Sequence, residues 1–512
     1  MIDTYTKIYE KKLSDLTIEK NAKIALYGTG DGAEVIYQIM CKNGYEEQII
    51  EVVDADDSPN IGNLFHGHEI NSITNVCDKI DVIIICALIY HRLIESRVRD
   101  YIEKNHKDVF VINPFGHNTV KQIEEYVHYL ENGINTKDDL YKAYTQSSIE
   151  LNSNDTRIIA WYLPQYHKTK TNDKYHGKGF TDWVNTSKAL PMFVNHYQPH
   201  IPYDVGYYDL NDPDVFVRQI ELAKHYGVYG FSFYYYWFSG KRELEKPLEY
   251  FLAHKELDFK YCITWANENW STLWDGGKKE VILEQNLKEE DDVKFISDLI
   301  PYLEDERYIT VGDKPLLILY RPNLWTKERV NILFGNIRKE CKKIINKELY
   351  IVVCNTFGFE EEASDWGADA VAEFPPHNFP RFIKNTRIDG YLNPNFVGYI
   401  RDASDFIKEK EYLQKIRSKD YFRAAVPSWD NSSRKAYGGA NIFIGFNPQT
   451  FQQWLVDIML ESKKIHNKDE DIVFVNAWNE WAEGAHLEPD MKYGYANLEA
   501  VKKAIEIVRD RK

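Results

Sequence analysis

Long hydrophobic runs are missing from this chain of 512 residues. No stretch approaches the roughly 18 consecutive apolar residues of a membrane-spanning helix, so the sequence predicts no transmembrane segment. Residues 1–16 are rich in charge and lack the apolar core of a secretory signal. We therefore expect a protein of the cytoplasm.

Cysteine is scarce, and the six cysteines lie far apart. Cys86, Cys262 and Cys354 fall within apolar runs, where a free cysteine behaves as a small hydrophobic residue. No spacing of Cys, His and Asp in the sequence is typical of a metal site. We expect a reducing compartment and no bound metal.

Positive charge is also in short supply, with 63 Lys and Arg against 79 Asp and Glu and a net charge of −16. A protein that binds a nucleic-acid backbone normally presents a concentrated basic face, so we expect no nucleic-acid partner. Aromatic residues, by contrast, are abundant at 14%. Tyr and Trp combine an apolar face with a polar group, which suits both a protein core and a sugar-binding groove.

The first 150 residues read as a small α/β domain. An apolar strand at residues 22–27 leads into a glycine-rich turn and a helix, and residues 81–87 form a continuous apolar run typical of a buried parallel strand. Strands that alternate with helices predict a Rossmann-like parallel sheet. A polar stretch from about residue 121 predicts a helical linker, so we place the boundary near 150.

A dinucleotide-type motif lies in this domain. Gly28, Gly30 and Ala33 follow a strand and open a helix, and the acidic Asp54 ends the next strand. In that context the bare backbone can approach a phosphate group at the helix N-terminus. The motif predicts a nucleotide or nucleotide sugar as ligand, and a purely structural or docking role is the alternative.

Residues 151–512 repeat the strand-then-helix theme about eight times. The candidate strands are 157–163, 230–237, 260–265, 316–320, 350–355, 370–374, 423–429 and 472–478. Eight such units in this span predict a (β/α)₈ TIM barrel. Its active site should lie at the C-terminal ends of the strands, and these ends are followed by Trp, Tyr, Asn, His and carboxylates.

Glu480 and Glu483 follow the last predicted strand and are the candidate catalytic residues. Breaking a glycosidic bond needs one carboxyl group to protonate the leaving oxygen and a second to assist at the ring. Residues three apart share a face of a helical turn, and neighbouring Trp478 and Trp481 would raise the pKa of one carboxyl group by desolvation. A glutamate pair on a solvated helix face is the alternative.

Thirteen further residues at the strand ends are candidates for substrate binding. Glu268 and Glu373 would accept hydrogen bonds from sugar hydroxyls, with structural ion pairs as the alternative. The others could equally be core residues. The full set is Tyr162, His167, His200, Tyr234, Tyr236, Trp265, Asn267, Glu268, Trp270, Glu373, Trp429, Asp430 and Asn479.

Five motifs in this order resemble those of the WbsX-type, glycoside hydrolase family 99-like proteins. They are YLPQYH at 162–167, GFTDW at 179–183, HYQPH at 196–200, WANENW at 265–270 and NAWNEWAEG at 476–484. The resemblance runs from about residue 157 to 499. It implies a (β/α)₈ barrel, no obligatory cofactor, and a role in bacterial surface polysaccharide (O-antigen or capsule) metabolism.

The resemblance also implies a mechanism, because related endo-α-mannosidases use both glutamates of a similar motif. Glu480 would act as base on the 2-hydroxyl of the sugar, giving an anhydro-sugar intermediate, and Glu483 would act as general acid and then as base. Configuration would be retained. Ala482 departs from the bulkier residue of those hydrolases, so mannose as the substrate does not carry over.

Three functions follow from these patterns. The first is a retaining glycosyltransferase or transglycosylase that acts on surface-polysaccharide precursors, with an oligo- or polysaccharide partner and a nucleotide sugar as a further ligand. The second is an endo-α-glycosidase that uses the same two glutamates. The third is a non-catalytic glycan-binding protein, against which the intact glutamate pair counts.

Overall fold

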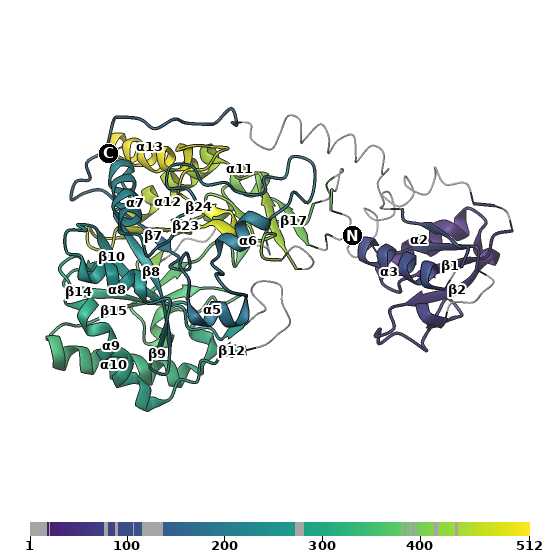
Figure 1. Cartoon of the computed structure of the whole chain (residues 1–512), viewed down its shortest axis with the longest axis horizontal. Coiled ribbons are helices and arrows are strands. Elements are labelled where there is room, and N and C mark those ends of the chain that lie inside the picture. The colour runs from purple at the N-terminus through teal and green to yellow at the C-terminus, as the bar shows by residue number, and fades with distance from the viewer. Residues whose placement is uncertain are drawn as a thin grey trace. The chain divides into compact units, whose positions relative to one another are not determined.

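The computed structural model describes two compact units of the chain (Figure 1). The smaller contains Met1–Glu131, Pro191–His196 and Ile388–Val397, and the larger contains the rest. The described residues are 18–19, 21–75, 80–87, 91–105, 107–114, 137–271, 281–379, 382–386, 388, 392–393, 396, 398–413, 418–435 and 439–511. Residues 121–136 of the predicted linker lie outside them, and the boundary near 150 stays a prediction.

The smaller unit is built on a six-stranded sheet in the order β3-β4-β2-β1-β5-β6. Only β3 (Leu64–Phe65) is antiparallel to its neighbour. The parallel strands are β1 (Ile24–Tyr27), β2 (Ile49–Asp54), β4 (His68–Ser72), β5 (Val82–Ile85) and β6 (Phe110–Ile112). The sheet of strands with helices that the sequence predicts is therefore present.

Both faces of this sheet are apolar because successive strand residues point to opposite sides. Ile24 and Leu26 join a buried cluster with residues of helix α2 (Asp31–Lys42). The alternate residues Ala25 and Tyr27 join a second cluster with residues of helix α3 (His91–Lys104). One helix therefore covers each face.

The larger unit is a nearly closed barrel of parallel strands. Its strands in sheet order are β7 (Arg157–Tyr162), β8 (Gly230–Phe238), β10 (Lys260–Trp265), β14 (Lys314–Leu319), β15 (Tyr350–Asn355), β16 (Ala370–Glu373), the pair β18 (Tyr421–Phe422) and β19 (Ala424–Ala425), and β22 (Ile472–Val475). β18 pairs with β16, and β19 pairs with β22, which returns to β7. The predicted TIM barrel is confirmed, with all eight strands near their predicted positions.

The seam at 421–425 depends on a buried charge pair. Arg423 separates β18 from β19, is 1% exposed, and donates to the carboxylates of Glu373 and Glu461. Glu373 also accepts a hydrogen bond from the backbone N–H of Ala424. A buried guanidinium needs such partners, so Glu373 closes the barrel and the structural ion pair is the arrangement observed.

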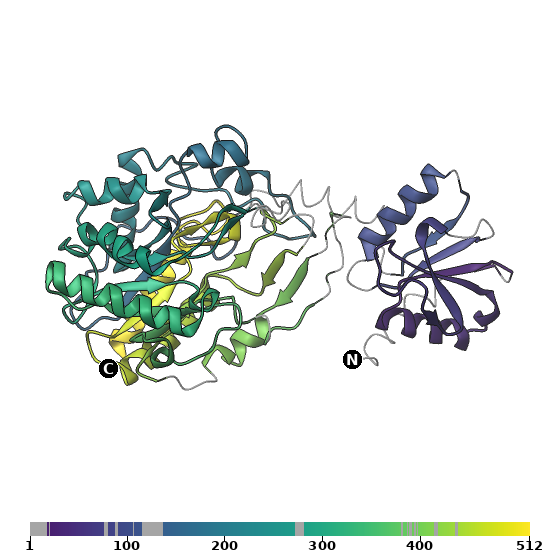
Figure 2. The same cartoon turned by 90° about the horizontal axis from the view of Figure 1, so that it is seen from below.

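Helices surround the barrel, as the teal to yellow ribbons of Figures 1 and 2 show. The long ones are α7 (Pro213–Tyr226), α9 (Glu289–Leu303), α10 (Lys327–Ile345), α12 (Pro448–Ile465) and α13 (Ala496–Asp510). α7 begins where the Asp212 side chain caps the N-terminus and ends at Gly227, whose φ of 85° suits glycine. Between β15 and β16 the helix is reduced to the 3₁₀ turn η5 (Ala363–Trp366).

The other helices and strands are shorter. Strands β20 (Trp429–Asp430), β21 (Asn441–Ile444) and β17 (Tyr399–Asp402) form a separate three-stranded sheet. The remaining elements are α5 (Lys170–Tyr175), α6 (Trp183–Lys188), β9 (Lys241–Glu243), α8 (Lys246–Ala253), β11 (Trp270–Ser271), β12 (Val281–Leu283), β13 (Thr310–Val311), α11 (Ser404–Lys408), β23 (Asn479–Glu480), η8 (Trp481–Glu483) and β24 (Ala485–His486), with the short 3₁₀ turns η1 (Glu46–Gln48), η2 (Ile73–Asn75), η4 (Pro322–Leu324) and η7 (Glu411–Leu413).

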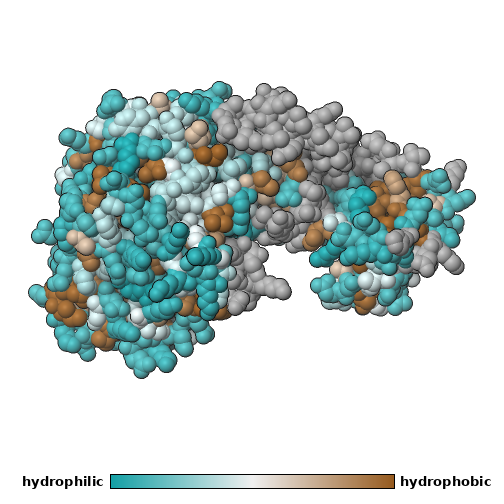
Figure 3. Space-filling model, in the orientation of Figure 1, coloured by the Kyte–Doolittle hydropathy of each residue, from teal (hydrophilic) through white to brown (hydrophobic). Residues whose placement is uncertain are grey.

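The surface drawn in Figure 3 is largely hydrophilic, with hydrophobic residues in small separate groups. Among the described residues, no helix has both the length and the apolar character needed to cross a membrane.

Candidate active site

A pocket of about 820 Å³ opens at the C-terminal ends of the barrel strands. Residues in or shortly after each of the eight barrel strands line it, namely Leu163, Tyr236, Ala266, Tyr320, Phe357, Phe374, Trp429 and Glu480. The volume is within the range of small-ligand sites. Seven of the residues predicted from sequence line it, namely Tyr234, Tyr236, Glu268, Trp270, Trp429, Glu480 and Glu483.

Glu480 and Glu483 lie on a tight hairpin that follows the last strand. β23 and β24 pair antiparallel, and the 3₁₀ turn η8 joins them. Gly484 ends the turn with a φ of 62°, and a Cβ atom there would lie 3.3 Å from His200. The α-helical face expected for the two glutamates is therefore replaced by a shorter turn, which still places both carboxylates at one pocket.

Arg434 connects the two glutamates to a third carboxylate. Its Nη1 donates to Glu483 at 2.6 Å, and its Nη2 donates to Glu480 at 3.0 Å and to Asp182 at 2.6 Å. All four side chains are shielded from solvent, with exposures of 9% for Arg434 and between 0% and 21% for the carboxylates. One cation thus holds three potential negative charges in a dry site.

This arrangement raises the pKa of both glutamates. Burial raises the pKa of Glu480 to about 8, the charge of Arg434 opposes that shift, and the charges of Glu483 and Asp182 add to it. Burial also raises the pKa of Glu483, again against Arg434. Two interacting carboxyl groups of this kind titrate together, so near neutral pH the pair can hold one proton and one negative charge.

Glu488 holds the hairpin in place through buried hydrogen bonds. Its carboxylate accepts hydrogen bonds from the indole N–H groups of Trp478 at 3.1 Å and Trp481 at 2.7 Å. The side chains of Gln219 and Tyr208 donate to it at 2.7 and 3.0 Å. Burial nevertheless raises the pKa of Glu488 to about 7. Trp478 and Trp481, which neighbour Glu480, are therefore held in place by a carboxylate that accepts four hydrogen bonds.

Two asparagines extend the strand pairing beyond the barrel. Asn479 accepts from the backbone N–H of Leu163 at 2.7 Å and donates to the carbonyl of the same residue at 3.0 Å. Asn267 makes the equivalent pair with Arg321, both bonds being 2.8 Å. Both side chains thus position strand ends and lie outside the pocket lining.

The structure places several other predicted binding residues away from the pocket. The Tyr162 hydroxyl donates to Gln219 of α7, and the Trp265 ring stacks on Phe295 of α9 at 4.0 Å, so both lie between barrel and helices. His167 donates from Nδ1 to the Pro164 carbonyl. Asp430 accepts from Gln198 at 2.7 Å. With His200, Asn267, Glu373 and Asn479, these residues support the site rather than line it.

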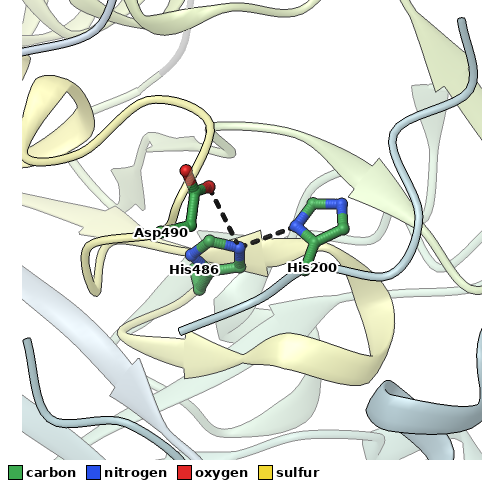
Figure 4. A group of neighbouring side chains, drawn as sticks. All are labelled: His200, His486 and Asp490. Carbon is green, nitrogen blue, oxygen red and sulfur yellow. Dashed lines mark hydrogen bonds and ion pairs between the residues drawn. The ribbon is translucent and has the colours of Figure 1, made fainter. Parts of the chain in front are cut away.

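His200, His486 and Asp490 form a buried group behind the hairpin (Figure 4). The His486 Nδ1 donates to the Glu488 carbonyl at 2.9 Å, so its Nε2 accepts from His200 Nδ1 at 2.8 Å. Two imidazoles and a carboxylate suit Zn²⁺, but tetrahedral zinc ligands lie about 3.3 Å apart, farther than these two nitrogens. His200 and His486 are thus a hydrogen-bonded pair, and the Asp490 carboxylate lies 3.7 Å from the same nitrogen of His486.

Several pocket residues carry little signal in the sequence. Arg434 lies in a polar loop without a recognisable motif, and Arg401 and Lys435 are similarly isolated in sequence. Asp182 and His377 could have been predicted from the sequence, because Asp182 belongs to the GFTDW motif and His377 follows the sixth strand.

Comparison with known proteins identifies the larger unit. The family model "Glycosyltransferase WbsX" matches residues 158–501. In two strains of Xanthomonas campestris pv. campestris, a protein named WxcX and described as uncharacterized is 38% identical over 349 residues, which is 68% of this chain. The match covers 49% of those relatives, so the chain spans about half of their length.

Two solved structures are similar over most of the chain. A GH99 endo-alpha-mannosidase from Bacteroides thetaiotaomicron is 12% identical with a TM-score of 0.42, and the match covers 70% of this chain and 98% of that one. A glycoside hydrolase-like protein is 16% identical with a TM-score of 0.44, over 72% and 98%. From its family match and its relatives, the chain belongs to the WbsX glycosyltransferase family.

Proposed function

We propose that the protein is a retaining enzyme that transfers glycosyl groups across α-glycosidic bonds during bacterial surface-polysaccharide (O-antigen or capsule) synthesis in the cytoplasm. The observation that carries this proposal is the pair Glu480 and Glu483 on one guanidinium, at a pocket formed by all eight strand ends. Burial raises the pKa of Glu483, which favours the protonated form that a general acid requires, and the charge of Arg434 favours the ionised form of Glu480 that a base requires.

In the proposed reaction, Glu483 protonates the leaving oxygen and Glu480 removes the proton of the 2-hydroxyl, whose oxygen closes an anhydro ring at the anomeric carbon. Glu483 then takes a proton from the acceptor hydroxyl, which attacks the anomeric carbon, and Glu480 returns its proton to the 2-oxygen. Two displacements at the anomeric carbon retain configuration. Arg434 balances the charge that moves between the two glutamates.

An endo-α-glycosidase is the second candidate, because the same steps with water as acceptor give hydrolysis. Mixed lining of the pocket by Tyr234, Tyr236, Trp270 and Trp429 suits sugar rings in either case, since such rings have apolar faces. The nature of the acceptor distinguishes the two functions.

For the smaller unit we propose a nucleotide or nucleotide sugar as ligand of the Gly28, Gly30, Ala33 and Asp54 turn. Gly28 has a φ of 113°, and Gly30 immediately precedes helix α2. Asp54 accepts hydrogen bonds from Thr29 at 2.7 Å and Ser58 at 2.9 Å. A bound ribose would have to exchange with one of these hydroxyl groups.

The experiment is to incubate the full chain with labelled nucleotide sugars and with defined oligosaccharides, each with and without a sugar acceptor. We expect a new glycosidic product that depends on the acceptor and has the configuration of the donor, as read by NMR. Release of free sugar at the same rate without acceptor would establish the hydrolase instead. No turnover of any donor or oligosaccharide would contradict both.

A further inference from the structure

Four cationic side chains line the active-site pocket, and we call their surface the cationic wall. Arg321, Arg401, Arg434 and Lys435 all line the pocket, whereas the carboxylates that line it are Glu268, Glu480 and Glu483. A neutral oligosaccharide gives such a wall nothing to neutralise. Which ligand these cations can bind therefore depends on which of them are already paired with carboxylates.

The carboxylates are already engaged by two of the four cations. Arg434 holds Glu480 and Glu483, and Arg321 is ion-paired with Glu268. Arg434 must also neutralise Asp182. The carboxylates that line the pocket are thus satisfied without Lys435.

Lys435 is half-buried beside Arg434, and its ammonium makes no ion pair with any residue that the structure describes. Its positive charge nonetheless affects the pKa of two other pocket residues. It lowers the pKa of Glu483 on one side and that of His377 on the other. The charge of Lys435 therefore acts on both Glu483 and His377.

Arg401 enters the pocket from strand β17 of the separate sheet. Its Nη1 donates to the carbonyl of Ile383 at 2.9 Å, and its guanidinium lies 5.4 Å from the Tyr399 ring centre. Burial lowers the pKa of Arg401 from its usual value, as expected for a guanidinium shielded from water.

The pKa of His377 is also affected by the positive charges of this pocket. Its Nδ1 lies 3.4 Å from the Tyr320 hydroxyl, and its ring packs against Phe357 at 4.1 Å. Burial and the positive charges of Arg321 and Lys435 lower its pKa to about 3. A neutral imidazole among cations can donate a hydrogen bond to an anion without adding repulsion or charge.

We infer that Lys435, Arg401, Arg321 and His377 form a subsite for an anionic group on the substrate, beside the glutamates. A carboxylate of an acidic sugar and a phosphate ester of a glycosyl donor share the chemistry that this wall recognises. The inference rests on the proposed function for its location, since it gives the class of substrate that the same pocket takes.

The test measures binding rather than turnover, so its result is independent of the catalytic proposal. Full-length protein is titrated by calorimetry with an oligogalacturonate, with the carboxyl-reduced neutral oligosaccharide of equal length, and with inorganic pyrophosphate. We expect at least one anion to bind tenfold or more tightly than the neutral sugar, with a preference that weakens as salt rises. Preference for the oligogalacturonate indicates a sugar carboxylate, and preference for pyrophosphate indicates a phosphate group.

Variants assign the preference to this wall. Lys435→Gln and Arg401→Gln should each reduce the affinity for the preferred anion about tenfold, while Lys339→Gln on the exposed face of α10 should leave it unchanged. Lys435→Arg keeps the charge and should keep most of the affinity. Equal binding of charged and neutral ligands, no binding of either anion, or an unchanged preference in folded Lys435→Gln would overturn the inference. Anion binding without any turnover would instead count against the proposed function.

Discussion

At the scale of single residues, Arg434 determines the charge of the site. It is the cation shared by Asp182, Glu480 and Glu483, and it lowers the pKa of both glutamates against the effect of burial. Without it, three carboxyl groups would face one another in a dry site, where like charges strongly favour protonation. Removal of the guanidinium should therefore move the titration of the pair to higher pH.

We predict that Arg434→Gln shifts both limbs of the pH–rate profile upward. The acid limb reports the carboxylate that must be ionised, and the alkaline limb reports the carboxyl group that must be protonated, and the mutation raises the pKa of both. At neutral pH the rate should fall by about 10–100-fold, because less of the base is ionised. Arg434→Lys should recover part of the loss. A pH–rate profile in which the rate falls but both apparent pKa values stay unchanged would contradict this role.

Glu480 itself should reduce stability at neutral pH. Its pKa is about 8 in the folded protein against an ordinary value of 4.5, so the folded state binds the proton more tightly than the unfolded state. The resulting penalty is absent below about pH 4.5, grows as pH rises from there to about 8, and is constant above.

We predict that Glu480→Gln is more stable than the wild type at pH 8, by up to about 4 kcal/mol, since each pKa unit corresponds to about 1.4 kcal/mol. The difference should shrink toward zero near pH 4.5. Unfolding free energies from denaturant titrations at several pH values test this, with exposed Glu306→Gln as the control. A stability difference that is independent of pH, or larger in acid, would be inconsistent with a raised pKa.

At the scale of elements, the two asparagine clamps offer a matched comparison. Asn479 fixes the strand that carries Glu480 to Leu163, and Asn267 fixes the end of β10 to Arg321 by the same two bonds. Each Ala substitution leaves one buried N–H group and one carbonyl without its partner, which costs about 1–3 kcal/mol per group.

We predict that Asn479→Ala and Asn267→Ala lose similar stability but differ in activity. Asn479→Ala should lower kcat by at least tenfold because the neighbouring Glu480 loses its position, whereas Asn267→Ala should act mainly on KM through Arg321 and Glu268. Melting temperatures and steady-state kinetics of both variants make the comparison. Equal losses of kcat would show that the clamps serve only stability.

Most of these elements could be predicted from sequence because their patterns are local. Apolar runs such as 472–478 gave the barrel strands, and a capping Asp212 with Pro213 and Gly227 marked α7. The roles of Glu373 and Arg434 could not be predicted in this way. Their partners lie 50 and 46 residues away at Arg423 and Glu480, and no periodicity encodes such a pair.

The same limit applies to the aromatic candidates. Trp265 and Trp270 belong to one motif, yet Trp270 lines the pocket and Trp265 packs on α9. Side chains of a strand alternate between the two faces, so residue type alone could not assign each tryptophan to the pocket or to the layer between barrel and helices.

At the scale of the whole molecule, the smaller unit raises the question of a second ligand. If its glycine turn binds a nucleotide or nucleotide sugar, the ligand should stabilise full-length protein by about 2.7 kcal/mol at 100 times its dissociation constant. Thermal unfolding across a panel of nucleotides and nucleotide sugars measures this effect. Asp54→Asn should reduce the shift, and exposed Asp57→Asn should not. Unchanged melting across the panel would favour a structural or docking role.

The central claim is that Glu480 and Glu483 form one catalytic unit. The most direct test is turnover by Glu480→Gln, Glu483→Gln and the double variant on the substrate found by the acceptor experiment, beside their unfolding temperatures. We predict that each single change lowers turnover by about 10²–10⁴ in a folded protein. The double variant should lose far less than the product of the two, because both act in the same proton transfers. Near-normal turnover in either folded single variant would contradict the assignment.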